Sequence, residues 1–185
     1  MIEAITYEKM VKSVAAFLDD HSGIAPTRML NADSIRGTDL SEMISSSQSY
    51  SPEASEPFAL FEFLENSADE NFATKGETET VITTIQRYDL HLKIYGNRSP
   101  AAAQRLFAAF KQADNALFLR EKGIFVLGVT PIEPVNEFVN NTWLLRRDLI
   151  VKLQVRFDIE GLAEDPGVFD ETQSISAIVL EAAKA

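Results

Sequence analysis

The chain has 185 residues, no cysteine, 45% hydrophobic residues and a formal net charge of −11. This length suits one domain, which can bury roughly 70% of the surface of its unfolded chain and so folds without a metal or a disulfide. The missing cysteines exclude thiolate chemistry. The excess of acidic over basic residues argues against a general phosphate-binding surface. Without a signal-peptide pattern or an apolar run long enough to span a membrane, we expect a soluble protein that is intracellular when made.

The N-terminal part of the chain predicts one helix and then a long loop. Apolar side chains recur at three- and four-residue steps between residues 3 and 19, which predicts an amphipathic helix ended by Gly23 and Pro26. Residues 27–57 are rich in Ser, Glu and Pro and lack apolar periodicity. They predict a long loop that becomes ordered only where a partner covers it.

Two apolar segments after this loop predict a β-hairpin. Residues 58–64 are apolar and aromatic, and the turn-rich residues 66–79 connect them to the alternating segment 80–96. In that segment the apolar side chains fall on one face and most polar ones, among them Arg87 and Asp89, on the other. Such alternation predicts a sheet with one face in the core and the other in contact with water or a partner.

The next elements are two helices, a strand and a loop. A helix is expected from Ser99, whose hydroxyl is the predicted N-cap, to about residue 113. Asp114 is predicted to cap a short second helix, and residues 123–129 have the composition of a buried strand. Residues 130–140 contain two prolines and are predicted to be a loop.

The segment NNTWLLRRDLIVKLQVRFD, residues 140–158, begins as a loop and becomes the clearest strand of the sequence. Apolar side chains occupy nearly every second position, so one face of this strand is expected in the core. Arg147 falls on that apolar side, where its guanidinium would need a carboxylate or backbone carbonyls. A β-bulge near Arg146 would exchange the roles of the two arginines. The simpler alternative is that both point to water.

This order of elements predicts an α+β fold with a mostly antiparallel sheet and helices packed on one face, plus a long loop and a C-terminal extension. We expect one domain over residues 1–160, which includes the loop 27–57, and a C-terminal arm over residues 161–185. The arm contains a short apolar segment that we predict to dock on an adjacent copy of the chain. Its apolar side chains are Ile175, Ile178, Val179 and Leu180.

Motifs for catalysis and cofactor binding are absent from the sequence, including GxGxxG, Walker A, HExxH and GxSxG. The two histidines, His21 and His91, fall in different elements, and a solvated or paired role suits His91 better than a role as ligand or base. We therefore expect no enzymatic activity, no cofactor and no metal site.

Features between Tyr88 and Asp158 follow one another in a distinctive order. The first are the strand end LHLKIYG (90–96), the helix SPAAAQRLFAAF (99–110) and the strand GIFVLGV (123–129). After a proline-containing loop comes an aromatic-x-x-Arg-x-x-apolar start of a long strand, formed by Trp143, Arg146 and Leu149. In this order the features resemble the tail terminator (neck) proteins of tailed bacteriophages.

The resemblance implies a non-enzymatic structural protein of the virion neck or tail, made in the host cytoplasm. It implies a ring, usually of six copies, that caps the tail tube and contacts a head-completion or connector protein on its other side. By match of motif, Arg146 is the family's arginine. From the strand patterns we expect subunit or loop-locking contacts from Arg87, Asp89, Trp143, Arg146 and Arg147.

DNA passes through a neck without specific binding, so we expect part of the net charge to line a channel that repels phosphates. One alternative is another tail or neck component, such as a tail-completion, head-closure or tube subunit. The other is a stand-alone binding domain or an enzyme of unknown substrate, which would need polar side chains converging in a pocket. No membrane partner is expected.

Overall fold

A computed structural model describes residues 5–32, 56–75, 80–139 and 142–159. For residues 67–75, 80–83, 139, 142, 158 and 159 it describes the backbone alone. The helices are α1 (Tyr7–Ser22), the short 3-10 helix η1 (Pro26–Arg28), α3 (Ser99–Lys111) and α4 (Ala113–Glu121). The strands are β1 (Met29–Asn31), β2 (Phe58–Lys75), β3 (Thr80–Tyr95), β4 (Ile124–Val129), β5 (Glu133–Val139) and β6 (Thr142–Ile159).

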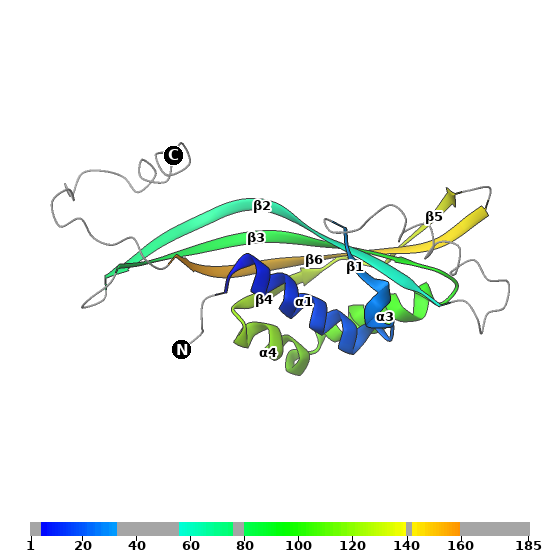
Figure 1. Cartoon of the computed structure of the whole chain (residues 1–185), viewed down its shortest axis with the longest axis horizontal. Helices are drawn as coiled ribbons and strands as arrows, with labels where there is room; N and C mark the ends of the chain where they lie inside the picture. Colours follow the sequence, from blue (N-terminus) through cyan, green and yellow to red (C-terminus); the bar gives the residue numbers. More distant parts are fainter. Residues whose placement is uncertain (1–4, 33–55, 76–79, 140–141, 160–185) are drawn as a thin grey trace.

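The strands form one six-stranded sheet in the order β1-β2-β3-β6-β4, with β5 also paired to β6. Because β3 occupies one edge of β6, β4 and β5 lie one after the other along its second edge. All neighbours are antiparallel except β1 and β2. Figure 1 shows a long twisted sheet with the helices on one of its faces. The predicted α+β class, with a mostly antiparallel sheet and helices on one face, is confirmed.

The core lies between the helices and the face of the sheet that they cover. Alternate side chains of β3 and β6 point into it, as Leu90 and Leu92 pair with Val151 and Leu149 in the register. The helices contribute a matching apolar stripe, which includes Met10, Val14, Phe17, Leu18, Leu106 and Phe110. Burying one such side chain contributes about 1.5–3 kcal/mol, so this face holds the layers together.

Local signals set both ends of α1, and its predicted end at Gly23 is confirmed. The Thr6 hydroxyl accepts a hydrogen bond from the Lys9 amide at 3.3 Å and caps the first turn. Gly23 ends the helix with a φ of 70°, a left-handed conformation that glycine adopts without strain. The predicted helix, residues 3–19, therefore exists but lies about three residues further along the chain.

Three segments that were predicted to be loops contain secondary structure. The proline-containing residues 130–140 hold β5 rather than only a loop, and β2 continues to Lys75 through residues predicted to be a connection. The predicted loop 27–57 includes the last two residues of η1 and the whole of β1. Pro134 is compatible with β5 because this strand borders the sheet, where a missing backbone N–H costs least. Residues 33–55 of the predicted loop and the arm 161–185 lie outside the described residues.

The predicted helix caps were also wrong. Ser99 is the first residue of α3 rather than its N-cap, and its hydroxyl is buried with no partner among the described residues. Asp114 lies within the first turn of α4, where a negative charge complements the helix dipole without capping it. Among the described helices, none combines the length and apolarity needed to cross a membrane.

Gly96 makes the turn between β3 and α3. Its φ is 103°, and a Cβ there would lie 3.3 Å from the Pro57 Cα. Its amide donates to the Leu145 carbonyl at 3.0 Å. Both the backbone conformation and the close approach therefore require glycine at this position.

We expect Gly96→Ala to lower the free energy of unfolding by about 1–3 kcal/mol, because the new side chain strains the backbone and meets the chain at Pro57. The matched control is Gly128→Ala, where a Cβ meets nothing within 4 Å and the change should stay within about 0.5 kcal/mol. Urea unfolding curves measure both variants. Equal losses would contradict this account of the turn.

Candidate functional site

The sheet face opposite the helices carries a row of charged side chains of alternating sign. We call Glu62, Lys93, Asp148, Arg146 and Glu137 the charge row; they come from β2, β3, β6, β6 and β5. The Lys93 Nζ lies 2.9 Å from the Glu62 Oε1, and Lys93 stands opposite Asp148 in the register. Because each charge borders one of opposite sign, the row links strands that are far apart in the sequence.

Arg146 has the most contacts of the charge row. Its Nε and Nη2 donate to the two carboxylate oxygens of Asp148 at 2.7 and 2.6 Å, and its Nη1 forms an ion pair with Glu137. The Arg146 side chain is only 14% exposed. The hydrogen bonding that Arg146 donates to Asp148 is the main cause that raises the pKa of Arg146, so this guanidinium stays charged. A two-point contact of this kind fixes orientation as well as charge.

A small apolar cluster lies on the same face beside Arg146. Phe58 and Tyr95 stack with ring centroids 4.7 Å apart and an interplanar angle of 4°, and Leu144 packs with them. The Arg146 guanidinium lies 5.9 Å from the centre of the Tyr95 ring, within the range of a cation–π contact. Burial, and then the nearby Glu137 charge, raise the pKa of Tyr95 to about 12. This face therefore has its own packed cluster, away from the helices.

The contacts of Arg146 fasten β5 to the sheet. Glu137 belongs to β5, whereas Asp148 and Arg146 belong to β6 and Tyr95 to β3. The guanidinium thus joins three strands at the end of the sheet where β5 and β6 form a hairpin. Arg146 and Arg147 both lie near this hairpin, but their side chains point to opposite faces of the sheet.

The side chain of Arg147 is on the core face of β6. The helices cover this face further along the strand. Arg147 pairs with Ile94 and Pro134 in the register, and its Nη1 donates to the Arg146 carbonyl at 2.8 Å. The continuous β3–β6 register through residues 146 and 147 contains no bulge. Within the described part of the chain, no carboxylate lies within ion-pair distance of Arg147. Of the two arginines, Arg146 is the one paired with carboxylates.

The structure places Arg87 and Asp89 on the face of the charge row but far from Arg146. Asp89 stands opposite Lys152, six positions along β6 from Arg146, which corresponds to about 20 Å along a strand. The Asp89 Oδ2 accepts a hydrogen bond from Asn66 at 2.9 Å, and Arg87 stands opposite Gln154. The predicted site residues therefore form two separate groups.

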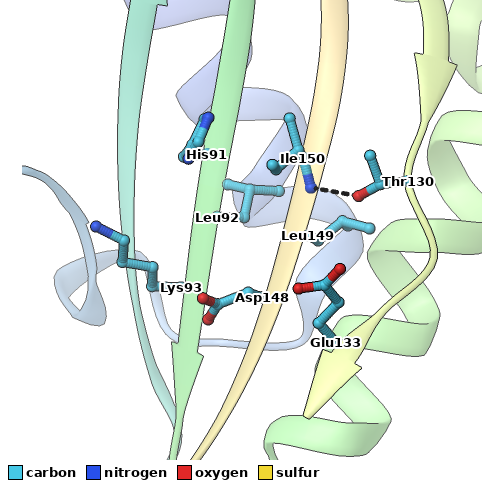
Figure 2. A pocket seen from close by; sticks show the side chains of 8 residues that line it. All are labelled: His91, Leu92, Lys93, Thr130, Glu133, Asp148, Leu149 and Ile150. Carbon is cyan, nitrogen blue, oxygen red and sulfur yellow. Dashed lines mark hydrogen bonds between the residues drawn. The ribbon is translucent and has the colours of Figure 1, made fainter. Parts of the chain in front are cut away.

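A shallow pocket of about 240 Å³ opens on the same face, between β3, β6 and the link from β4 to β5 (Figure 2). Its lining includes His91, Thr130, Glu133, Asp148 and Ile150. The Thr130 hydroxyl accepts from the Ile150 amide at 3.0 Å, and the Lys93 side chain is directed toward β2 in Figure 2. No group of metal-binding side chains converges anywhere in the described ranges. Of the polar side chains in this lining, Lys93 and Thr130 make contacts that hold strands together, and none of the lining residues forms a nucleophile–base pair.

Trp143 is not in the core. The residue is 67% exposed, and its ring centroid lies 5.2 Å from that of Phe138, which is 59% exposed, on the hairpin formed by β5 and β6. The side chains of Trp143 and Leu145 share the core face of β6, but Figure 1 shows the hairpin extending past the helices. An apolar surface is therefore presented where no described helix covers it.

Sequence reasoning missed Glu137 and Phe138, which lie in the segment predicted to be a loop. The local sequence signal for them is weak, because Val135, Asn136, Glu137 and Phe138 do not alternate between apolar and polar and two prolines precede them. Finding Glu137 required pairing the segment with the next strand.

We expect Arg146→Ala to lower the free energy of unfolding by about 2–3 kcal/mol, because it leaves Glu137 and Asp148 close together without a cation. The neighbouring Arg147→Ala is the matched control, since its guanidinium contacts a backbone carbonyl and its loss should cost no more than about 1 kcal/mol. Urea unfolding with tryptophan fluorescence is a direct measurement, as the only tryptophan, Trp143, reports on the hairpin. A larger loss from Arg147→Ala would contradict the assignment.

Comparisons with known proteins place these features in a family. A family model described as phage neck terminator protein matches residues 27–176, which includes every strand of the sheet. A search of curated proteins found no match to the chain. The match spans well over half of the chain and agrees with the resemblance seen in residues 88–158. The chain therefore belongs to the phage neck terminator protein family, which has a structural role in the neck of the phage tail.

Proposed function

We propose that this protein forms a ring, with six copies as the expected number, that caps the tail tube and joins it to the head-side connector protein. The observation that carries the proposal is the family match over residues 27–176. A ring subunit needs surfaces for two neighbours and for a partner above and below. The long sheet supplies such surfaces, because its open face and its two edges differ in chemistry.

β2 and β6, the two long strands that flank β3, are unequally covered on their sides away from β3. On the β6 side, β5 pairs with residues 142–148 and β4 with residues 151–155. On the other side β1 pairs only with Ala59–Phe61, and no described strand covers β2 beyond them. The rest of β2 therefore offers backbone groups to which another chain can add a strand.

The predicted arm suits such an edge. Its apolar side chains Ile175, Ile178, Val179 and Leu180 lie outside the described residues, and their docking stays a prediction. The arm follows β6, whose last residue Ile159 pairs with Ile82 of β3. β6 therefore ends near the tip of the β2–β3 hairpin, and we propose that the arm docks on a neighbour placed beside that tip.

The distribution of charge bears on the passage of DNA. Of the 17 basic and 28 acidic residues, 15 of each lie in the described ranges, so the described fold has no net charge. The other 2 basic and 13 acidic residues lie in segments 1–4, 33–55, 76–79 and 160–185, which carry the whole net charge of −11. We propose that these segments, rather than the sheet, present the negative charge that keeps DNA from binding in the channel.

Light scattering after size-exclusion chromatography tests the ring, with the protein alone and mixed with purified tail tubes. We expect a closed assembly of one size, formed either by the free protein or on the tube end, because ring contacts close on themselves. A protein that stays monomeric at high concentration and does not bind tubes would overturn the proposal. A structure of the ring with a basic or neutral channel surface would contradict only the proposal of a negatively charged channel.

Deleting residues 172–185 tests the arm. If the arm docks on a neighbour, the deletion should weaken assembly or change ring size in native mass spectrometry, while the unfolding midpoint of the monomer stays unchanged. The control replaces Ile175, Ile178, Val179 and Leu180 by serine in the full-length chain, which keeps the length of the arm. Rings of unchanged size and stability in both variants would show that the arm does not join subunits.

A further inference from the structure

The β5–β6 hairpin presents an apolar surface with a positive charge at its border. We call Phe138, Trp143, Leu145 and Arg147 the hairpin surface, because paired positions of β5 and β6 and alternate positions of β6 place them on one face. Phe138, Trp143 and Leu145 are all exposed, and Arg147 lies next to Leu145 along this face. A contiguous exposed apolar patch on a protein surface often marks a site where a partner binds.

Helix α4 presents a second apolar surface with the opposite charge at its borders. We call Asp114, Leu117, Phe118 and Glu121 the α4 surface, because three- and four-residue spacing places them on one face of the helix. Leu117 is 51% exposed and Phe118 is also exposed, whereas Leu119 on the opposite side of α4 is fully buried. Asp114 and Glu121 are exposed and lie one turn before and one turn after the apolar pair. Arg120 and Lys122 flank this face.

The two surfaces cannot meet within one chain. The chain leaves α4 directly into β4, where Ile124 stands opposite Val155, whereas Phe138 stands opposite Trp143. Twelve residues of β6 separate these positions, which corresponds to about 40 Å along a strand. In Figure 1 the hairpin extends beyond the helices at one end of the sheet, and α4 lies toward the other end.

We infer that the hairpin surface of one copy docks on the α4 surface of the next copy in the ring. This inference rests on the proposed ring and identifies its subunit contact. A head-to-tail contact needs two different, complementary surfaces at separate places on the subunit, and repetition of that contact closes a ring. Here Trp143 and Phe138 meet Leu117 and Phe118, and Arg147 faces the Glu121 carboxylate at one end of that apolar pair.

Charge complementarity is what selects a second copy as the partner. The apolar side chains at the centre of the contact supply buried surface area. Charges of opposite sign at the rim favour one orientation and disfavour the pairing of two identical surfaces. Two hairpin surfaces would bring Arg147 close to another Arg147, with no carboxylate of the hairpin surface to offset the repulsion. Two α4 surfaces would bring carboxylates together, although the exposed Arg120 and Lys122 beside them weaken that repulsion. The geometry therefore favours the alternating contact over a symmetric dimer.

Charge exchange gives the first test. Arg147→Glu alone and Glu121→Arg alone should each weaken assembly at least about tenfold, because like charges then face each other in every contact. In an equimolar mixture each contact between the two variants again joins opposite charges. We expect rings to reappear in native mass spectrometry with equal numbers of the two variants. If the mixture assembles no better than either variant, while the wild type forms rings, the inference is wrong.

Cross-linking gives a test that does not depend on charge. Because the chain has no cysteine, only the introduced cysteines can react. With a short bis-maleimide, the variant Leu145→Cys/Phe118→Cys should give a ladder up to the full ring. Each single variant should give almost none, because a head-to-tail contact keeps identical residues apart. The matched control is Leu64→Cys/Phe118→Cys, since Leu64 is 48% exposed on the opposite face and should give no ladder.

The outcomes separate this inference from the proposed ring. Rings that form without a ladder from the Leu145→Cys/Phe118→Cys variant would refute the hairpin–α4 contact and leave the ring intact. Equal ladders from that variant and the Leu64 control would refute it as well. A wild-type chain that does not assemble, alone or on tail tubes, would refute both.

Discussion

Strand β6 is paired along both edges, and this constraint sorts its side chains between two faces of the sheet. β3 covers one edge, β5 and β4 cover the other, and Thr130 bridges the interval between them through hydrogen bonds to both backbone groups of Ile150. With the backbone satisfied on both sides, the strand cannot slip without turning its apolar set to the wrong face. Leu149 and Val151 therefore lie under the helices while Arg146 and Asp148 lie on the open face.

This sorting explains which parts of the fold were predictable. The alternation in residues 80–96 and 140–158 correctly predicted two long strands and their core faces, because alternation is a local property of the chain. The end of α1 was predictable for the same reason, since Gly23 acts on its own helix. β5 was not, because Pro134 argues against a strand until its place at an edge is known.

The candidate site shows the same limit. The pattern correctly put Arg147 on the apolar side of its strand and Arg146 on the polar side, but it did not reveal what either one contacts. The partner Glu137 becomes visible only when β5 is aligned with β6, which is a non-local register. The pattern also assigned Trp143 to the core face, without indicating that the helices stop short of it. The period of a strand predicts which face of the sheet a side chain is on. Whether a helix covers that side chain depends on where the helix lies, which the strand's own sequence does not indicate.

The Arg146 contacts explain how the hairpin holds its position beyond the helical layer. An extended pair of strands is marginally stable alone in water, and here one face is exposed at Trp143 and Phe138. On the other face, Phe58, Tyr95 and Leu144 form a second cluster, and Arg146 ties Glu137 to it. A cluster on the open face stabilises the hairpin without covering its apolar side. That side stays exposed among the described residues, so the contact that we propose with a neighbouring copy would use an aromatic surface on a hairpin that is already ordered.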